Sequence, residues 1–171
     1  CVMWWTLPTS NSSLLERLQA SEINFASLLS GLLALADESA ALARQYYRNP
    51  NALEVKKKSD STPVTEADEA IHRLLLKCLP DLLPGVPVLS EECDAQQLAH
   101  RLTWTDCWVV DPLDGTREFI ERTDQFTINI ALCLDGIAEL GLISVPCEGR
   151  HWLGVVGDGA ACFNEPVIGH E

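Results

Sequence analysis

Acidic residues follow two short apolar segments of the sequence within four positions. Asp111 and Asp114 follow Cys107–Val110, and Glu91 follows Val86–Leu89. Binding and catalytic residues are often carried by loops at the ends of buried strands, so these carboxylates are candidates for a site. Grouped carboxylate oxygens are the ligands that Mg²⁺ and Mn²⁺ prefer in proteins. The two segments therefore predict a divalent-cation site.

The residues between the two aspartates favour a turn that directs both side chains to one point. Pro112 fixes its own φ, and Gly115 permits a tight turn. Each pattern also has a simpler explanation when it is taken alone. Asp-Pro-x-Asp-Gly is typical of an ordinary turn, and the glutamate pair beginning at Glu91 is typical of a solvated loop.

A third pattern lies upstream, where Thr65 and Asp68 have the spacing of a helix capping box. We expect a helix to begin here and to end at Pro80. Its apolar stripe consists of Ala67, Ile71, Leu74, Leu75 and Cys78. Capping alone would explain Asp68, and the joint occurrence of the three patterns is what favours a site.

Taken together, the three patterns resemble a known family. Asp111–Thr116 is similar to the signature of the inositol monophosphatase and fructose-1,6-bisphosphatase superfamily of metal-dependent, lithium-sensitive phosphatases. Leu89–Glu92 resembles its metal-glutamate motif, and Thr62–Asp68 resembles its Pro-Val-Thr-x-x-Asp segment. The resemblance extends over residues 56–164.

Two further segments, Thr116–Ile120 and Phe126–Leu132, are similar to the bisphosphate nucleotidase (CysQ) branch of that superfamily. The resemblance implies an enzyme that removes the 3′-phosphate of adenosine 3′,5′-bisphosphate, a by-product of sulfur assimilation. Its partner would be this small phosphorylated nucleotide. An inositol phosphatase of the same superfamily is the alternative enzyme, and a non-catalytic truncated fragment is the alternative of another class.

The resemblance also implies a role for each acidic residue. Glu91 would bind the first metal ion, Asp111 would bridge two ions, and Asp114 would bind the second. The main-chain carbonyl of Leu113 would complete one coordination shell. The cofactor would be two or three Mg²⁺ ions, with Mn²⁺ as a substitute and Li⁺ as an inhibitor.

The catalytic residues implied by the resemblance are Asp68 and Thr116, which would together orient or deprotonate the attacking water. The backbone amides of Gly115 and Thr116 would hold the phosphate. The residues expected to contact the substrate are Glu91, Leu113, Asp114, Gly115 and Thr116.

The fold expected from the resemblance is α+β, a layered α/β sandwich of the inositol monophosphatase type. Residues 13–171 would form its N-terminal portion, an antiparallel sheet plus two helices, behind a tail at residues 1–12. The family's C-terminal layer, with its Trp-Asp-x-Ala-Ala-Gly motif, would be missing, because Trp152 is followed by Leu-Gly. We therefore expect an exposed apolar sheet face, and weak or no activity from these 171 residues alone.

Hydrophobic periodicity predicts the remaining elements. A helix is expected from Ser13 to about Arg48, with Gly31 as a potential interruption, followed by a polar loop at residues 56–63. A helical turn is expected at Arg117–Arg122. Strands are expected at Phe126–Leu134, Ala138–Val145 and His151–Val156, with turns at Asp135-Gly136 and Gly157–Gly159.

Composition limits the classes of function and location. The net charge of −13 disfavours a nucleic-acid-binding protein. Seven cysteines without a CxxC pair favour a reducing, cytoplasmic location. The apolar stretch Ile23–Ala36 is shorter than the ~20 residues of a membrane span. The resemblance to the bisphosphate nucleotidase branch implies at most peripheral contact with the inner face of the membrane. The histidines show no shared ligand spacing and receive no role, and the oligomeric state is not determined by the sequence.

Overall fold

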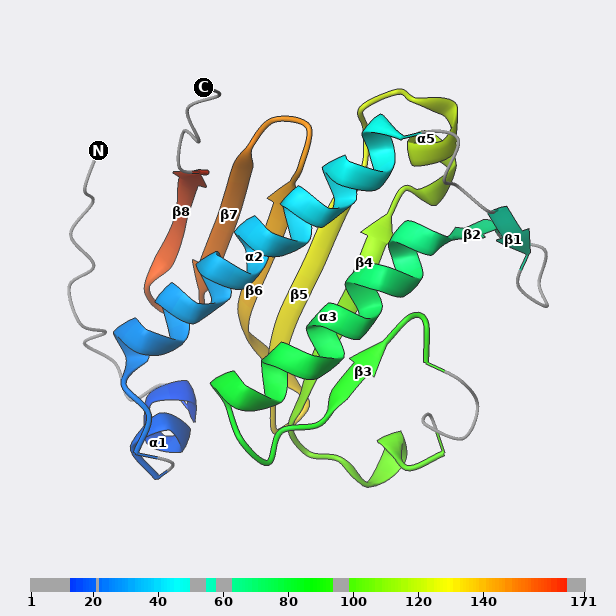
Figure 1. Cartoon of the computed structure of the whole chain (residues 1–171). Helices are drawn as coiled ribbons and strands as arrows, with labels where there is room; N and C mark the ends of the chain where they lie inside the picture. Colours follow the sequence, from blue (N-terminus) through cyan, green and yellow to red (C-terminus); the bar gives the residue numbers. More distant parts are fainter. Residues whose placement is uncertain (1–12, 21, 50–54, 58–62, 94–98, 166–171) are drawn as a thin grey trace.

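The computed structural model of the chain describes residues 13–20, 22–49, 55–57, 63–93 and 99–165, and the structural statements below concern these residues. Their main feature is one six-stranded sheet (Figure 1). Its strands, in spatial order, are β3 (Val88–Ser90), β4 (Cys107–Asp114), β5 (Thr127–Leu134), β6 (Ile137–Val145), β7 (Arg150–Val155) and β8 (Gly159–Asn164).

The sheet is mixed rather than wholly antiparallel. Strands β4 to β8 form an antiparallel meander, whereas β3 pairs with β4 in parallel. This corrects the expected antiparallel sheet at one edge. Because parallel strands end at the same edge of a sheet, the pairing brings the ends of β3 and β4 together.

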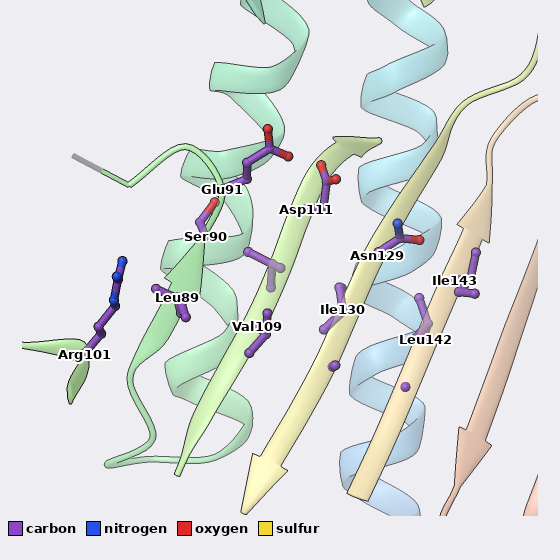
Figure 2. Close-up of a pocket in the computed structure, with 13 residues that line it drawn as sticks. Leu89, Ser90, Glu91, Arg101, Val109, Asp111, Asn129, Ile130, Leu142 and Ile143 are labelled. Atoms are coloured by element: carbon purple, nitrogen blue, oxygen red, sulfur yellow. The ribbon is translucent and has the colours of Figure 1, made fainter. Parts of the chain in front are cut away.

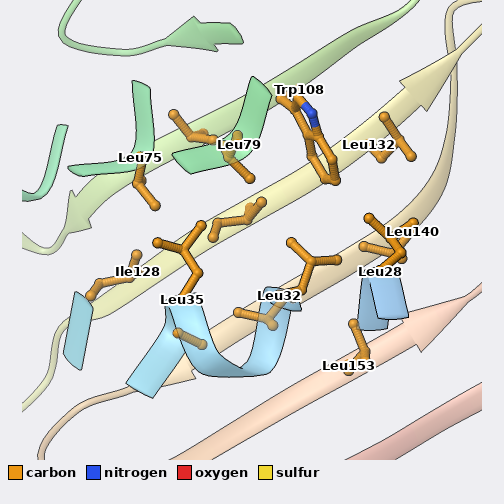
Figure 3. Packing of buried hydrophobic residues seen from close by; sticks show 14 of the residues in the cluster. Leu28, Leu32, Leu35, Leu75, Leu79, Trp108, Ile128, Leu132, Leu140 and Leu153 are labelled. Atoms are coloured by element: carbon orange, nitrogen blue, oxygen red, sulfur yellow. The ribbon is translucent and has the colours of Figure 1, made fainter. Parts of the chain in front are cut away.

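Two long helices, α2 (Phe25–Arg48) and α3 (Glu66–Leu82), cover one face of the sheet (Figure 1). Alternate residues of the central strands point toward these helices and are buried, as the regular alternation of burial along β5 illustrates. Figure 3 shows Leu32, Leu75 and Trp108 in this core, together with Ile128 and Leu140 from β5 and β6.

The single helix expected from Ser13 to Arg48 is two helices. Helix α1 covers Ser13–Ala20, and α2 begins after Asn24, whose side chain accepts a hydrogen bond from the Ser27 amide. A periodic apolar pattern continues across the break, which is why periodicity alone missed it. Gly31 does not interrupt α2.

Two other expectations need correction. Pro80 does not end α3, because it lies in the last turn of a helix that continues to Leu82. The ends of the expected polar loop form a two-stranded sheet of β1 (Val55–Lys57) and β2 (Pro63–Thr65). The hairpin turn expected at Gly157–Gly159 leads into β8, a strand for which the sequence gives no bounds. The expected helical turn is α5 (Thr116–Glu121), and a short 3₁₀ turn, η2, covers Arg101–Thr103.

The proposed tail at residues 1–12 lies outside the described residues.

The opposite face of the sheet carries exposed apolar side chains in the described part of the chain. Val109, Ile143 and Trp152 are 38%, 47% and 48% exposed. They lie on β4, β6 and β7, and Ile143 and Trp152 are directly paired. The expected exposed apolar face is therefore present.

Helix α2 is long and apolar enough to cross a membrane by length and composition alone. The helix is longer than the apolar stretch Ile23–Ala36, from which the sequence analysis argued against a membrane span. Leu28, Leu32 and Leu35 on one side of the helix are buried against the rest of the protein. Its packing therefore identifies α2 as a core helix of this fold.

Candidate metal and catalytic site

The parallel pairing of β3 and β4 places Glu91 next to Asp111. Ser90 is in register with Val110, and the Glu91 amide donates a hydrogen bond of 3.1 Å to the Val110 carbonyl. Figure 2 shows Glu91, Asp111 and Asn129 at the same end of three neighbouring strands. The first two predicted acidic segments therefore meet at one edge of the sheet.

A β-bulge places Asp111 and Asp114 on the same face of the sheet. In a regular strand, residues three apart point to opposite faces. Here Asp111 pairs with Asn129 and Asp114 pairs with Thr127, so β4 has one residue more than β5 between the two pairs. Pro112 lies inside the bulge, where a missing amide proton is tolerated. The predicted turn at this position is therefore a bulged continuation of β4.

Hydrogen bonds orient both aspartates. The Leu113 amide donates to Asp111 Oδ1 at 3.1 Å, and Asn129 Nδ2 donates to Asp114 Oδ2 at 3.0 Å. The amide of Asn129 is in turn oriented by the Thr127 hydroxyl, 3.2 Å from its Oδ1. The sequence analysis missed Asn129, and only its place in a predicted strand beside the aspartates could have indicated it.

The electrostatics of this edge are unfavourable for three ionised carboxylates. Burial and the neighbouring Glu91 and Asp114 raise the pKa of Asp111 from 3.8 to about 7. Asp111 and Glu91 also share a side-chain hydrogen bond, which favours the protonated carboxyl. A divalent cation at this position would relieve the repulsion, and the all-oxygen donor set fits a hard cation such as Mg²⁺.

Asp68 and Thr116, the predicted catalytic pair, are in contact. Thr116 Oγ1 lies 3.0 Å from Asp68 Oδ1 and 3.1 Å from the Leu113 carbonyl oxygen. Asp68 is almost fully buried, and its other oxygen accepts a hydrogen bond from the Thr65 amide within the predicted capping box. Burial raises the pKa of Asp68, although its hydrogen bonds from Thr65 and Thr116 act in the opposite direction.

Gly115 connects the bulged strand to α5. Its φ of +92° is in the left-handed region, and a Cβ atom there would lie 2.8 Å from the Gln125 carbonyl oxygen. A side chain is therefore excluded both by backbone conformation and by space. Helix α5 begins at Thr116, one residue before the expected start at Arg117, and the amides of its first turn have no acceptor within the helix.

An open depression of about 650 Å³ lies on the sheet face beside Glu91 and Asp111. Its floor is apolar and includes Val109 and Ile143, and Arg101 lines one side (Figure 2). The depression therefore joins the acidic edge to the exposed apolar face of the sheet.

A second polar cluster uses a histidine to which the sequence analysis gave no role. His151 is almost fully buried, and its Nε2 lies 2.9 Å from Asp37 Oδ1 and 3.9 Å from Glu165 Oε1. These three residues have the geometry to hold a metal ion. However, Arg44 contacts both oxygens of Glu165 at 2.6 Å, which makes the cluster an ionic network joining α2 to the outer strands.

Comparison with known proteins identifies the class to which this fold and site belong. The family model described as the inositol monophosphatase family matches residues 25–170. The chain therefore belongs to the inositol monophosphatase family.

Two relatives bear the name 3′(2′),5′-bisphosphate nucleotidase CysQ. The protein of Aggregatibacter actinomycetemcomitans is 38% identical over 78% of this chain and 49% of its own length. That of Salmonella typhimurium is 40% identical over 73% of this chain and 54% of its own length. The chain spans about half the length of the curated relatives it matches.

Solved structures have the same fold. CysQ from Bacteroides thetaiotaomicron, described as a bacterial member of the inositol monophosphatase family, is similar with a TM-score of 0.68 and 32% identity, over 86% of this chain and 52% of that one. The suhB protein of Bartonella henselae has a TM-score of 0.69 at 23% identity, over 80% of this chain and 52% of that one. The second likeness concerns the fold alone.

Proposed function

We propose that this chain carries the metal-binding and water-activating residues of a phosphatase that converts adenosine 3′,5′-bisphosphate into AMP and phosphate. The observation that carries the proposal is the convergence of Glu91, Asp111 and Asp114 at the ends of two strands. Thr116, which contacts Asp68, follows Asp114 by two residues. Relatives named as bisphosphate nucleotidases support this choice of substrate.

Four oxygen ligands would hold the cations. They are the carboxylates of Glu91, Asp111 and Asp114 and the main-chain carbonyl of Leu113. When bound, Mg²⁺ lowers the pKa of a coordinated water and neutralises charge on the phosphate. We propose two or three Mg²⁺ ions, replaceable by Mn²⁺, with inhibition by Li⁺. The net charge of −13 does not oppose an anionic substrate, because the local field near the phosphate would be that of the cations.

Thr116 and Asp68 would manage the proton of the attacking water. A threonine hydroxyl can donate one hydrogen bond and accept another. Thr116 would donate to Asp68 Oδ1 and accept from the water, so that the proton moves toward Asp68 as the water oxygen bonds to phosphorus. The P–O bond to the ribose 3′-oxygen breaks, and that oxygen takes up a proton. Water and the phosphate ester thus give AMP and inorganic phosphate.

The first turn of α5 would bind the phosphate oxygens. The amides of Gly115 and Thr116 lie at its start, and free amides at such a position favour an anion. The Gly115 conformation permits the close approach of the backbone that this requires. We further propose a cytoplasmic location, with at most peripheral contact with the inner face of the membrane.

The test is phosphate release from adenosine 3′,5′-bisphosphate by this chain. We expect slow release that requires Mg²⁺, falls with Li⁺, and is abolished by EDTA and by Asp111→Asn. Asp81→Asn is the matched control, because Asp81 is an exposed carboxylate on α3. Faster release from inositol 1-phosphate would favour the inositol phosphatase, and no Mg²⁺-dependent release from either substrate would contradict activity of the chain itself.

A further inference from the structure

His72 connects helix α3 to the end of strand β3. Its Nδ1 lies 2.9 Å from Ser90 Oγ, and Ser90 is the last residue of β3 and only 3% exposed. The function proposed above uses neither residue. Ser90 immediately precedes Glu91, so the contact lies one residue from a proposed metal ligand.

Ser90 holds the turn that carries Glu91. Its carbonyl accepts a hydrogen bond of 3.1 Å from the Cys93 amide, which closes a four-residue turn. Its hydroxyl oxygen accepts one of 3.3 Å from the Glu92 amide. Within this turn, Glu91 is tied to β4 through the Val110 carbonyl. The conformation of the Glu91 backbone therefore depends on Ser90.

We assign the Ser90 hydroxyl as the donor of the His72–Ser90 hydrogen bond, an assignment that requires the tautomer of His72 with its proton on Nε2. Since Ser90 Oγ accepts from the Glu92 amide, its own proton is available for His72 Nδ1. A neutral imidazole with its proton on Nε2 can accept it. Burial lowers the pKa of His72, which agrees with this neutral form. The imidazole thus fixes the rotamer in which Ser90 can accept from Glu92.

We propose that His72 is a positioning residue for Glu91: through the hydroxyl of Ser90 it holds the turn that presents the Glu91 carboxylate beside Asp111. The link from His72 to the turn rests on geometry alone. The clause that this carboxylate binds a cation rests on the proposed function.

Three variants of the full chain test the link. His72→Leu replaces the imidazole by an apolar side chain of substantial size and so removes the Nδ1 acceptor. His72→Asn is the matched control, because its Oδ1 can occupy the position of the imidazole Nδ1 and accept the same proton. Ser90→Ala removes the intermediary, and its combination with His72→Leu shows whether His72 acts through Ser90.

Two readouts separate the link from the proposed function. Amide hydrogen exchange, measured by NMR on the metal-free chain, reports the turn through Glu92 and Cys93 and the sheet through Ile130 and Leu142. Mn²⁺ affinity, measured by electron paramagnetic resonance, reports the cation site. Loss of a residue that orients a metal ligand typically weakens metal binding by about tenfold or more.

We expect His72→Leu to speed exchange at Glu92 by at least about tenfold, to leave Ile130 and Leu142 unchanged, and to weaken Mn²⁺ binding about tenfold. His72→Asn should remain within about twofold of wild type. Ser90→Ala should match His72→Leu, and the double variant should be no worse than either.

The proposal is overturned if exchange at Glu92 is unchanged in His72→Leu, if His72→Asn behaves like His72→Leu, or if the effects of the two single variants add. If His72→Leu also speeds amide exchange in the sheet, its effect on the turn is no longer specific. The link is then tested by comparing exchange at Glu92 in His72→Asn with that in Ser90→Ala. Absence of Mn²⁺ binding in the wild type would contradict the proposed function, while the exchange data would still decide the link between His72 and the turn.

Discussion

The hydroxyl of Thr116 lies 3.0 Å from Asp68, a residue 48 positions earlier in the chain. The same hydroxyl lies 3.1 Å from the Leu113 carbonyl oxygen, and it has one proton for these two acceptors. If a cation engages the Leu113 carbonyl, that carbonyl becomes a poorer acceptor and the proton is directed to Asp68. The hydrogen bond on which water activation would depend is thus strengthened by occupancy of the site.

Two substitutions of Thr116 distinguish the contribution of its hydroxyl group to activity from that of its side-chain volume. We expect Thr116→Val to lower phosphate release by about 10²–10⁴-fold, because general acid–base contributions are typically of this size. Thr116→Ser keeps the hydroxyl and should retain most of the activity. The measurement is the initial rate with saturating Mg²⁺. Equal rates for Thr116→Val and Thr116→Ser would contradict a role for the hydroxyl.

The raised pKa of Asp111 makes the stability of the metal-free chain depend on pH. The pKa rises from 3.8 in the unfolded chain to about 7 in the folded chain, so the folded chain favours the protonated carboxyl. This stabilisation is fully present below about pH 4 and is lost as the pH rises through about 7. We expect the midpoint of urea unfolding to be higher at pH 5 than at pH 8.

Two comparisons isolate Asp111 in that experiment. In Asp111→Asn the difference between pH 5 and pH 8 should shrink, whereas Asp81→Asn should keep it. Saturating Mg²⁺ should raise stability most at pH 8, where Asp111 is deprotonated. A wild-type chain that is more stable at pH 8 without metal would contradict the repulsion among these carboxylates.

Gly115 should tolerate no side chain. Gly115→Ala combines a positive φ with a contact of 2.8 Å to the Gln125 carbonyl oxygen, and we expect a loss of about 2–4 kcal/mol in the free energy of unfolding. Gly136→Ala is the control, because Gly136 has a φ of +76° but no atom within 4 Å of the added Cβ. Its cost should be about 1–2 kcal/mol. Equal losses in urea unfolding would show that the close contact is unimportant.

Substitution of two adjacent residues of β6 should change stability by very different amounts. Leu142 is 1% exposed beneath the helices, and Ile143 is 47% exposed on the other face. We expect Leu142→Ala to cost about 2–5 kcal/mol. Ile143→Thr should cost less than about 1 kcal/mol and reduce self-association, because it interrupts the exposed apolar surface. Sedimentation and urea unfolding measure both effects, and a large stability loss in Ile143→Thr would indicate that this face is covered.

Local sequence patterns predicted the elements that are locally determined. The capping box at Thr65, the strand at Phe126–Leu134 and the turn at Asp135-Gly136 are each determined within a few residues, and the structure has all three. The contact between Asp68 and Thr116 is an exception, because it joins distant segments. It was expected only from the resemblance to a family.

Features that depend on pairing between strands could not be predicted in this way. The bulge that directs Asp111 and Asp114 to one face exists only relative to the register of β5. The role of Asn129 follows from the same register, and the buried position of His151 follows from the packing of α2 on β7. Strand β8 has little alternation of its own and is defined by its pairing with β7.

The parallel edge of the sheet has a consequence for the order of folding. Strands β4 to β8 are neighbours in sequence and can pair as hairpins, whereas β3 reaches β4 only after residues 91–106. Pairings that are local in sequence generally form faster than those that close long loops. The acidic residues that follow β3 would thus approach those of β4 late, against electrostatic repulsion. A refolding rate that rises with Mg²⁺ would place this approach in the rate-limiting step, whereas slower unfolding at an unchanged refolding rate would place it after that step.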